Sequence, residues 1–291
     1  MLDGRTAVAT KAAVQTAADA TTSAHPQGPK LPDMSGSYGR YISSGLYDRR
    51  YPRPNRRTLR KMKQGLPAGG HFLDVGAGTG RYTLPLLQIG GTRCVAHDIC
   101  PVARETLGER LRDFVSDERL VIRGDDPDDL AAELPQAFDL ALLAFGVLAH
   151  VAWRAERLRL LRAIRTMLKA DGTLILSVPN AKRRFRAEQR DAEPLVREGT
   201  LEPGDVLYKR NQADGEIRLF YHLYTLEEVH RDLSEAGFRV ASVGAESLLS
   251  ERKVVSSRPL GWLDALACRL APTALGYDLL AVARPKPAGD V

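Results

Sequence analysis

The pattern of hydrophobic positions changes character at about residue 70. From there onward, short apolar runs alternate with longer segments in which apolar residues recur every three or four positions. Short apolar runs are typical of buried parallel strands, and the three-to-four spacing is typical of amphipathic helices. Strands are expected at 71–75, 93–97, 120–123, 138–145 and 173–178. This alternation predicts the βαβ units of a parallel sheet.

Two further strands are expected near the C-terminus, at 238–243 and 277–283, where an antiparallel hairpin would close the edge of the sheet. A helix precedes them, because Thr225 and Glu228 form a capping box at its start and Gly237 ends it. The right-handed crossover rule leaves few other ways to arrange these elements. The sequence therefore predicts an α/β fold with a doubly wound, seven-stranded, mostly parallel sheet.

The same pattern divides the chain into segments. Residues 1–33 are rich in Ala, Thr, Gln and Pro and contain no aromatic residue, so a disordered tail is expected. The segment 34–54 places tyrosines among basic residues, and we expect it to act as a lid. One domain is predicted over 55–285. The stretches 180–222 and 245–276 do not fit the alternation and are interpreted as insertions that recognise a substrate.

A glycine-rich loop follows the first expected strand. Gly76, Gly78 and Gly80 have the spacing G-x-G-x-G, whereas a dinucleotide-binding loop has G-x-G-x-x-G. Glycine allows the backbone to turn sharply and to approach a ligand closely. Asp74 precedes the first glycine, and its carboxylate would repel the phosphates of a dinucleotide. The loop therefore favours a ligand that carries a cationic amine or sulfonium.

Acidic residues follow the next two expected strands. Asp98 ends the second strand, where a carboxylate can accept hydrogen bonds from both hydroxyls of a ribose. Asp125 follows the third strand, where its carboxylate can accept a hydrogen bond from the exocyclic amine of an adenine. Because the carboxyl ends of parallel strands meet at one edge of a sheet, the loop and both acids are expected to form one site.

These motifs, in this order, resemble those of the class I S-adenosylmethionine-dependent methyltransferases. The resemblance covers residues 70–178 and 225–283. Leu73–Gly80 is similar to the first motif of that superfamily, Asp98 to its ribose-binding acid, and Gly124–Asp125 to its adenine-side motif. The resemblance implies a Rossmann-like methyltransferase fold and S-adenosylmethionine as the cofactor. The cofactor-binding residues that it implies are Asp74, Gly76, Ala77, Gly78, Gly80, Asp98, Ile99, Asp125, Asp126 and Phe145.

Three residues are candidates for catalysis. His150 lies just beyond the fourth strand, where this fold places the methyl acceptor, and a histidine there can act as a general base. The alternative is that His150 orients the loop through a hydrogen bond. Tyr221 and His222 end the 180–222 insertion, and a Tyr-His pair here recurs in several methyltransferases, including enzymes that modify the wobble uridine of tRNA. The pair is expected either to line the site or to pack in the core.

The cysteines do not predict a metal site. Cys94, His97 and Cys100 have a spacing found among metal ligands, but alternation along a strand points Cys94 and His97 to opposite faces. Zinc requires a fourth ligand, and no candidate lies nearby. Structural cysteines and no metal are therefore predicted. Three cysteines in 291 residues also exclude a disulfide scaffold and favour a reducing compartment.

Charge and hydropathy restrict where the protein is expected to be located and what it is expected to bind. No apolar run reaches the roughly 18 residues of a membrane helix, and the start lacks the features of a signal peptide, so a cytoplasmic protein is predicted. There are 42 lysines and arginines against 36 aspartates and glutamates, a net charge of +6. This balance permits either nucleic acid or an anionic substrate. The sequence does not indicate an oligomeric state.

The choice of methyl acceptor depends on where the basic residues lie. Clusters at 49–63 and 182–186 favour contacts with RNA phosphates, or they are solvated helix faces. The 180–222 insertion, however, mixes basic residues with acids that repel a continuous phosphate backbone. We therefore predict methyl transfer to an oxygen or nitrogen of a small molecule or glycan. The alternatives are a tRNA methyltransferase of the wobble-uridine type and a cofactor-binding module without activity.

Overall fold

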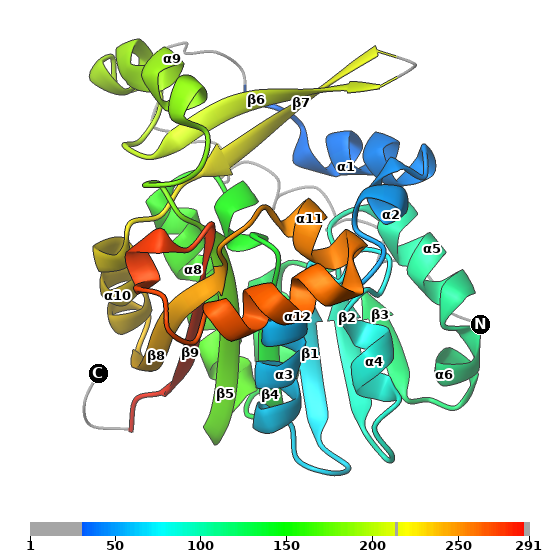
Figure 1. The fold of residues 1–291 in the computed structure, drawn as a ribbon. Coiled ribbons are helices and arrows are strands. Elements are labelled where there is room, and N and C mark those ends of the chain that lie inside the picture. The colour runs from blue at the N-terminus through cyan, green and yellow to red at the C-terminus, as the bar shows by residue number, and fades with distance from the viewer. Residues whose placement is uncertain (1–30, 213–214, 288–291) are drawn as a thin grey trace, which may run out of the picture.

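A seven-stranded sheet forms the centre of the protein (Figure 1). The computed structural model describes residues 31–212 and 215–287. The strand order is β3-β2-β1-β4-β5-β9-β8, in which β1 to β5 run parallel while β9 is antiparallel to both β5 and β8. The strands are β1 (His71–Val75), β2 (Arg93–His97), β3 (Leu120–Arg123), β4 (Phe138–Leu143), β5 (Leu168–Pro179), β8 (Phe238–Ser247) and β9 (Asp278–Pro285). The predicted doubly wound, mostly parallel sheet and its antiparallel C-terminal edge are confirmed.

Several details of the sheet differ from the prediction. β5 begins at Leu168 rather than at residue 173, and β8 continues to Ser247 rather than ending at residue 243. β4 ends at Leu143 rather than at residue 145, because Phe145 and Gly146 have φ angles of +61° and +74° that turn the chain out of the sheet. β8 and β9 pair with each other, but no tight turn joins them. Their connection contains α11 (Glu251–Ser256), α12 (Arg258–Ala267) and the 3₁₀-helix η2 (Thr273–Leu275).

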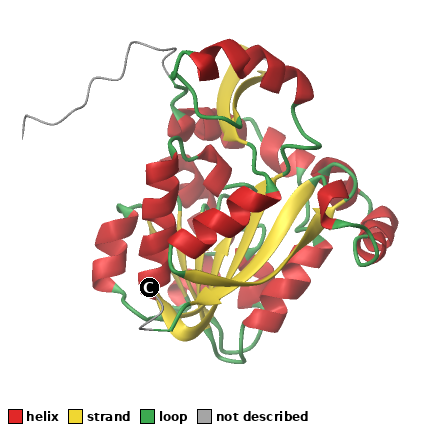
Figure 2. Ribbon diagram, turned by 90° about the vertical axis from the view of Figure 1, so that its left-hand side faces the viewer, coloured by secondary structure: helices red, strands yellow, loops and turns green. Residues whose placement is uncertain are grey.

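Helices cover both faces of the sheet (Figures 1 and 2). Side chains of successive strand residues point to opposite faces, so Phe72 packs in the cluster that includes Met62 of α3, and Leu73 packs in the cluster that includes Leu161 of α8. Burial of both faces is what a parallel sheet requires. The helices are α3 (Arg56–Gly65), α4 (Thr83–Leu87), α5 (Pro101–Arg110), α6 (Arg112–Ser116), α7 (Pro127–Glu133), η1 (Leu148–His150), α8 (Arg154–Met167) and α10 (Leu226–Glu235).

A second layer lies above the carboxyl ends of the parallel strands (Figure 1). It consists of α1 (Met34–Ser43), α2 (Leu46–Arg50), α9 (Arg186–Arg197) and an antiparallel pair, β6 (Asp205–Gln212) and β7 (Gly215–His222). α1 packs against α5 and β7. Asn180 begins the 180–222 insertion and Tyr224 lies two residues beyond its end, and these two residues form a β-bridge. The insertion therefore leaves and re-enters the sheet layer at one point, directly above the strand ends.

The remaining predictions concern the N-terminal tail, the 34–54 segment and membrane-spanning helices. Residues 1–30 of the predicted tail lie outside the described residues. The 34–54 segment, predicted to be a lid, supplies α1 and α2 of the second layer. Among the described residues, no helix is both long enough and apolar enough to cross a membrane.

Candidate active site

A cavity of about 490 Å³ lies at the carboxyl ends of β1, β2 and β4. Side chains of α1 and α2 complete its wall from the second layer. Every cofactor residue predicted from the sequence lines this cavity except Gly80. Those that line it are Asp74, Gly76, Ala77, Gly78, Asp98, Ile99, Asp125, Asp126 and Phe145. Parallel strands bring these residues together because their carboxyl ends share one edge of the sheet.

The three loop glycines have different roles, although all have positive φ angles, of +71°, +58° and +86° for Gly76, Gly78 and Gly80. A Cβ on Gly76 would lie 2.5 Å from Cγ2 of Val147, and one on Gly80 would lie 2.7 Å from Cδ1 of Leu107. Near Gly78, the closest atom to an added Cβ is the Tyr47 hydroxyl, at 3.8 Å. Gly76 and Gly80 are therefore required for packing, whereas Gly78 leaves its backbone open to a ligand.

Asp98 fixes the glycine loop to the end of β2. Its Oδ2 accepts a hydrogen bond of 2.8 Å from the backbone N–H of Gly78, and its Oδ1 accepts one of 2.9 Å from that of Cys100. Burial raises the pKa of Asp98, and these two hydrogen bonds oppose the rise. Each carboxylate oxygen still has a free lone pair. Asp98 can therefore accept hydrogen bonds from ligand hydroxyls while it holds the loop.

Asp74 lies beneath the loop and is only 3% exposed. Its Oδ2 accepts a hydrogen bond of 2.7 Å from the hydroxyl of Thr83. Burial raises the pKa of Asp74 to about 6. At neutral pH the carboxylate is therefore largely ionised, and it favours a cationic group in the cavity.

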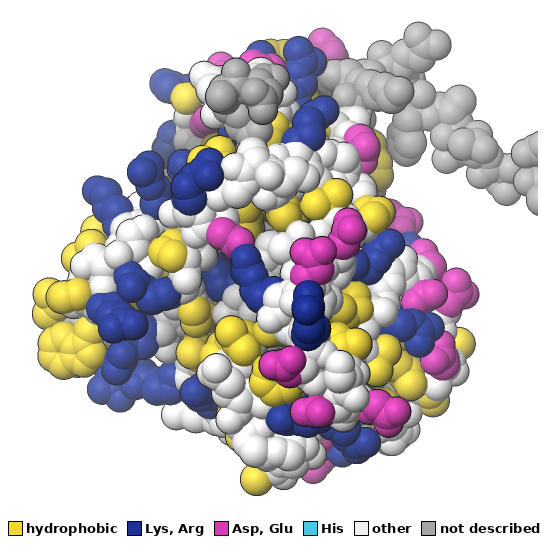
Figure 3. All heavy atoms as spheres, turned by 90° about the vertical axis from the view of Figure 1, so that its right-hand side faces the viewer, with side chains coloured by type: hydrophobic (Ala, Val, Ile, Leu, Met, Phe, Trp, Pro, Cys, Tyr) yellow, Lys and Arg dark blue, Asp and Glu magenta, His cyan; other side chains and the backbone are white. Residues whose placement is uncertain are grey.

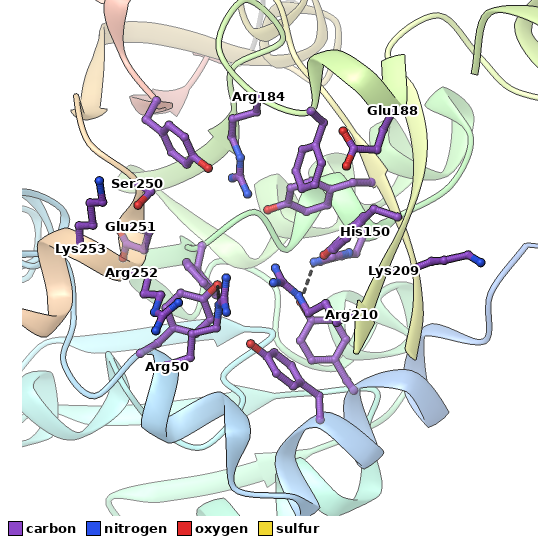
Figure 4. A pocket seen from close by; sticks show the side chains of 18 of the residues that line it. Arg50, His150, Arg184, Glu188, Lys209, Arg210, Ser250, Glu251, Arg252 and Lys253 are labelled. Atoms are coloured by element: carbon purple, nitrogen blue, oxygen red, sulfur yellow. Dashed lines mark hydrogen bonds between the residues drawn. The ribbon is translucent and has the colours of Figure 1, made fainter. Parts of the chain in front are cut away.

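A second cavity, of about 660 Å³, lies next to the first, beneath the second layer (Figure 4). Its walls are rich in tyrosine and arginine side chains from α1, α2, α11, β6 and β7. Tyr38, Phe145 and His150 line both cavities. These three residues therefore form the junction between the two cavities.

A comparison with known families agrees with this arrangement. A family model described as a methyltransferase domain matches residues 47–243, which include the glycine loop, Asp98 and His150. The chain belongs to this methyltransferase family. The cofactor that the sequence predicts for it is S-adenosylmethionine. The first cavity fits this cofactor, because Asp74 provides negative charge for a sulfonium and Gly78 leaves the backbone open.

The methyltransferase is also similar to several known proteins. A protein of Encephalitozoon cuniculi (strain GB-M1) named as a methyltransferase is 28% identical over 181 residues, 60% of this chain and 72% of the relative. The structure of an S-adenosylmethionine-dependent methyltransferase of Methanosarcina mazei has a TM-score of 0.59 at 18% identity, covering 78% of this chain and 97% of that one. The Burkholderia thailandensis 1,6-didemethyltoxoflavin N1-methyltransferase has a TM-score of 0.52 at 20% identity, covering 86% and 88%. That structure contains 1,6-didemethyltoxoflavin and S-adenosylhomocysteine.

The two acids after β3 reach the cofactor cavity but are already paired with arginines. Asp125 accepts a hydrogen bond of 2.6 Å from Nε of Arg123, and Asp126 accepts one of 2.9 Å from Nη1 of Arg159. Arg123 lowers the pKa of Asp125, and Arg159 lowers the pKa of Asp126. Both acids therefore stay ionised and retain lone pairs for a ligand. The role of Asp125 toward an adenine stays a prediction.

The sequence analysis missed Arg81, which lines the cofactor cavity directly after the glycine loop. Its guanidinium lies 4.1 Å from the centroid of the Phe145 ring, and its Nη1 lies 3.4 Å from Oε1 of Glu251. Arginines near the start of a helix are usually solvated. The carboxylate that pairs with Arg81 follows 170 residues later in the chain. No local pattern could therefore indicate that this side chain is buried.

His150 is held by two hydrogen bonds at the junction. Its Nδ1 donates to the carbonyl oxygen of Phe220 at 2.8 Å, so the hydrogen lies on Nδ1 and Nε2 accepts from the Tyr38 hydroxyl at 2.6 Å. Burial lowers the pKa of His150 to about 3. The ring is therefore neutral at physiological pH. The orienting hydrogen bond that we considered as its alternative role is present.

Tyr221 and His222 lie in different surroundings, although they are neighbours in β7. Tyr221 lines the second cavity, with its ring centroid 4.4 Å from that of His150. His222 is 2% exposed and lines neither cavity. Alternation along the strand turns the two side chains to opposite faces. Of the two roles that the sequence left open for this pair, Tyr221 lines a cavity and His222 packs in the interior.

His222 belongs instead to a buried polar network. Its Nδ1 bonds to Oδ1 of Asp205 at 2.7 Å, and its Nε2 lies 3.4 Å from Nη2 of Arg157. Arg157 also donates to Oε2 of Glu202 at 2.9 Å. Glu202, Asp205 and His222 are close enough together to hold a metal ion. The guanidinium of Arg157 already supplies the positive charge there, so we assign no metal to this group.

The three residues with metal-like spacing in and after β2 are separated by the fold. Cys94 and Cys100 are buried free thiols that pack in different hydrophobic clusters. Nε2 of His97 forms a hydrogen bond of 2.8 Å with the carbonyl oxygen of Asp125. Each residue thus has a structural contact of its own.

Proposed function

We propose that this methyltransferase acts on an oxygen or nitrogen atom of a small molecule or glycan. The observation that carries the proposal is the junction at Tyr38, Phe145 and His150, where a second cavity opens onto the cofactor cavity. At about 660 Å³, this second cavity has the size of a site for a compact ligand. A compact acceptor bound there would lie directly beside the cofactor.

Different residues of the first cavity would bind different parts of the cofactor. We assign Gly76, Ala77 and Gly78 to the backbone contacts, Asp98 to the ribose, and Asp74 to the cationic end. Ile99, Asp125, Asp126 and Phe145 complete the assigned set. When bound, S-adenosylmethionine supplies an electrophilic methyl group on its sulfonium.

The residues of the junction would position the acceptor. The Tyr38 hydroxyl donates its hydrogen bond to His150. The lone pairs of the hydroxyl oxygen can therefore accept a hydrogen bond from an O–H or N–H of the methyl acceptor. We assign His150 a positioning role through Tyr38, because its Nε2 is already occupied. Alignment of the two reacting atoms and exclusion of water are the main contributions that a protein makes to such a transfer.

The second layer supports the choice of a compact acceptor. Side chains of α1, α2 and the β6–β7 pair line the second cavity, and these elements lie above the strand ends in Figure 1. A layer in this position can hold water away from a small substrate. Among proteins of the same fold, the Burkholderia thailandensis enzyme is an N1-methyltransferase of 1,6-didemethyltoxoflavin. That protein is a precedent for a nitrogen acceptor on this fold.

A tRNA is the alternative acceptor. On the face shown in Figure 3, lysine and arginine side chains gather towards one side and acidic side chains towards the other. The structure divides the predicted basic clusters, however. Arg50 and Arg184 line the second cavity, while Nε of Arg53 donates to the backbone carbonyl of Val255. These side chains do not offer one continuous track for a phosphate backbone.

The experiment that tests the proposal follows a methyl label from the cofactor. The full chain is incubated with labelled S-adenosylmethionine and, separately, with a small-molecule extract, a glycan fraction and bulk tRNA. We expect label in the small-molecule or glycan fraction, together with release of S-adenosylhomocysteine. Label in tRNA alone, with affinity that falls steeply as salt increases, would overturn the proposal. Tight cofactor binding without any release would favour a module without activity.

A further inference from the structure

We propose that the methyl acceptor is an acid, and that Arg50, Arg184 and Arg210 bind its carboxylate or phosphate group in the second cavity. This inference rests on the proposed function and names the substrate class of the same site. The three arginines come from separate parts of the chain, namely the end of α2, the segment before α9, and β6. Their guanidinium groups all point into the same cavity (Figure 4).

Two of the three arginines have no carboxylate partner among the described residues. Arg184 pairs with Asp278 at 2.6 Å, whereas Arg50 and Arg210 form no ion pair within the described part of the chain. Nε of Arg50 donates to the Tyr51 hydroxyl at 3.2 Å, and the guanidinium of Arg210 lies 5.7 Å from the ring centroid of Tyr41. Aromatic contacts stabilise a cation without neutralising its charge. The cavity therefore carries positive charge that an anionic ligand would balance.

Hydrogen-bond donors in the wall also lack acceptors. The Tyr41 hydroxyl, Nε of Arg184 and Nε of Arg210 are buried, and each lacks a hydrogen-bond partner within the described residues. Tyr41 itself is 3% exposed. Buried donors normally have a partner, because burial removes their hydrogen bonds to water and nothing offsets that loss. Small adjustments of these side chains would bring their donors to the oxygens of a carboxylate or phosphate, which accept several bonds at once.

The acids in the same wall do not cancel this charge. Glu251 is already engaged, since its Oε1 lies 3.4 Å from Arg81 and its Oε2 accepts a hydrogen bond of 2.9 Å from Asn55. Glu188 is the other carboxylate that lines the cavity. Arg252 and Lys253 of α11 add two further cations. The excess of positive charge in this cavity favours an anion over a neutral acceptor of the same shape.

The aromatic rings in the wall of the second cavity guide the choice of small molecules for a binding test. Tyr208 and Tyr221 face each other with ring centroids 5.8 Å apart, and Phe185 packs against both. Flat aromatic probes match such a wall. Benzoate carries a carboxylate, phenyl phosphate carries a phosphate, and benzamide is the neutral counterpart of benzoate. Comparing the two anions shows which acidic group the cavity prefers.

The experiment measures binding of these probes to the full chain saturated with S-adenosylhomocysteine. We expect at least one anion to bind about tenfold more tightly than benzamide, and Arg210→Gln to weaken that anion about tenfold. The matched control is Arg218→Gln, because Arg218 lies in the adjacent strand with its side chain 74% exposed and its Nε on Glu216. This control should leave anion binding unchanged.

Folding is checked independently of the anion. Arg210 and Arg50 do not line the cofactor cavity, so a folded variant should keep its affinity for S-adenosylhomocysteine. If Arg210→Gln loses that affinity, Arg50→Gln takes its place in the comparison. Equal binding of benzamide and both anions, or anion binding that is unaffected in every folded variant, would overturn the inference.

The result of the probe-binding experiment can be distinguished from a failure of the proposed function, because no methyl transfer is needed to measure probe binding. Methylation of neutral acceptors alone, with acids rejected, would overturn the inference and leave the proposed function standing. Anion binding that depends on Arg210, in a protein that methylates only tRNA, would overturn the proposed function and identify the anion as a phosphate of the nucleic acid.

Discussion

The hydroxyl of Tyr38 donates a hydrogen bond of 2.6 Å to Nε2 of His150, across 112 residues of sequence. The two rings meet edge to face, with their centroids 5.1 Å apart. Tyr38 belongs to α1 in the second layer, and His150 ends η1 after β4. Because both residues line both cavities, this contact joins the second layer to the sheet at the place where acceptor and cofactor would meet.

Replacement of this hydroxyl should reduce turnover. Tyr38→Phe leaves the buried Nε2 of His150 without its donor and removes the oxygen proposed to hold the acceptor. We expect kcat to fall about 10- to 100-fold, the equivalent of roughly 1.4–2.8 kcal/mol, with an unchanged KM for the cofactor. Release of S-adenosylhomocysteine measures both constants. Tyr224→Phe is the matched control, because the Tyr224 hydroxyl is buried without a hydrogen-bond partner in the described structure. Equal kcat values for the two variants would contradict the assignment.

Cofactor binding should depend on pH through Asp74. Burial raises the pKa of this carboxyl to about 6, so it is ionised above that pH and neutral below it. Binding of the cationic sulfonium favours the ionised form, and the affinity for S-adenosylmethionine should therefore fall as pH decreases through 6. Calorimetric titrations between acidic and neutral pH measure this change. In Asp74→Asn the affinity should be lower at neutral pH and the pH dependence weaker. An unchanged pH profile in that variant would show that another group is responsible.

The sheet and the cofactor cavity could be predicted from the sequence, because both depend on short segments of the chain and on the order of those segments. Most acids and glycines of the first cavity lie at or just beyond the end of a strand, as Asp74 lies at the end of β1 and Asp98 follows β2. Parallel pairing then brings the strand ends together without further information. The hydrophobic pattern needed only to place the strands, which it did to within a few residues.

The second cavity could not be predicted in the same way, because its walls come from segments far apart in the chain. The partner of Arg81 is Glu251, and the partner of His150 is Tyr38. Neither pair has a sequence spacing that indicates contact. Strand periodicity could have separated the roles of Tyr221 and His222, because neighbouring residues of a strand point to opposite faces.

Asp98 should be required for cofactor affinity, partly through the loop that it holds. In Asp98→Asn one oxygen and the negative charge are lost, so the hydrogen bonds to Gly78 and Cys100 cannot both be kept. We expect the affinity for S-adenosylhomocysteine to fall about 10- to 100-fold, as the loss of one or two charge-assisted hydrogen bonds implies. Titration calorimetry measures the change. Asp113→Asn, an exposed position on α6, is the control. Wild-type affinity in Asp98→Asn would remove the ribose assignment.

His222 should matter for stability and not for turnover. In His222→Ala, the buried carboxylate of Asp205 and the buried guanidinium of Arg157 lose a polar neighbour, and the missing ring leaves a cavity. We expect the free energy of unfolding to decrease by about 1–3 kcal/mol, while kcat stays unchanged in the folded enzyme. Urea denaturation measures the first quantity and release of S-adenosylhomocysteine the second. His230→Ala, at an exposed position of α10, should change neither. A His222→Ala variant with wild-type stability and reduced kcat would contradict this assignment and favour a catalytic role for His222.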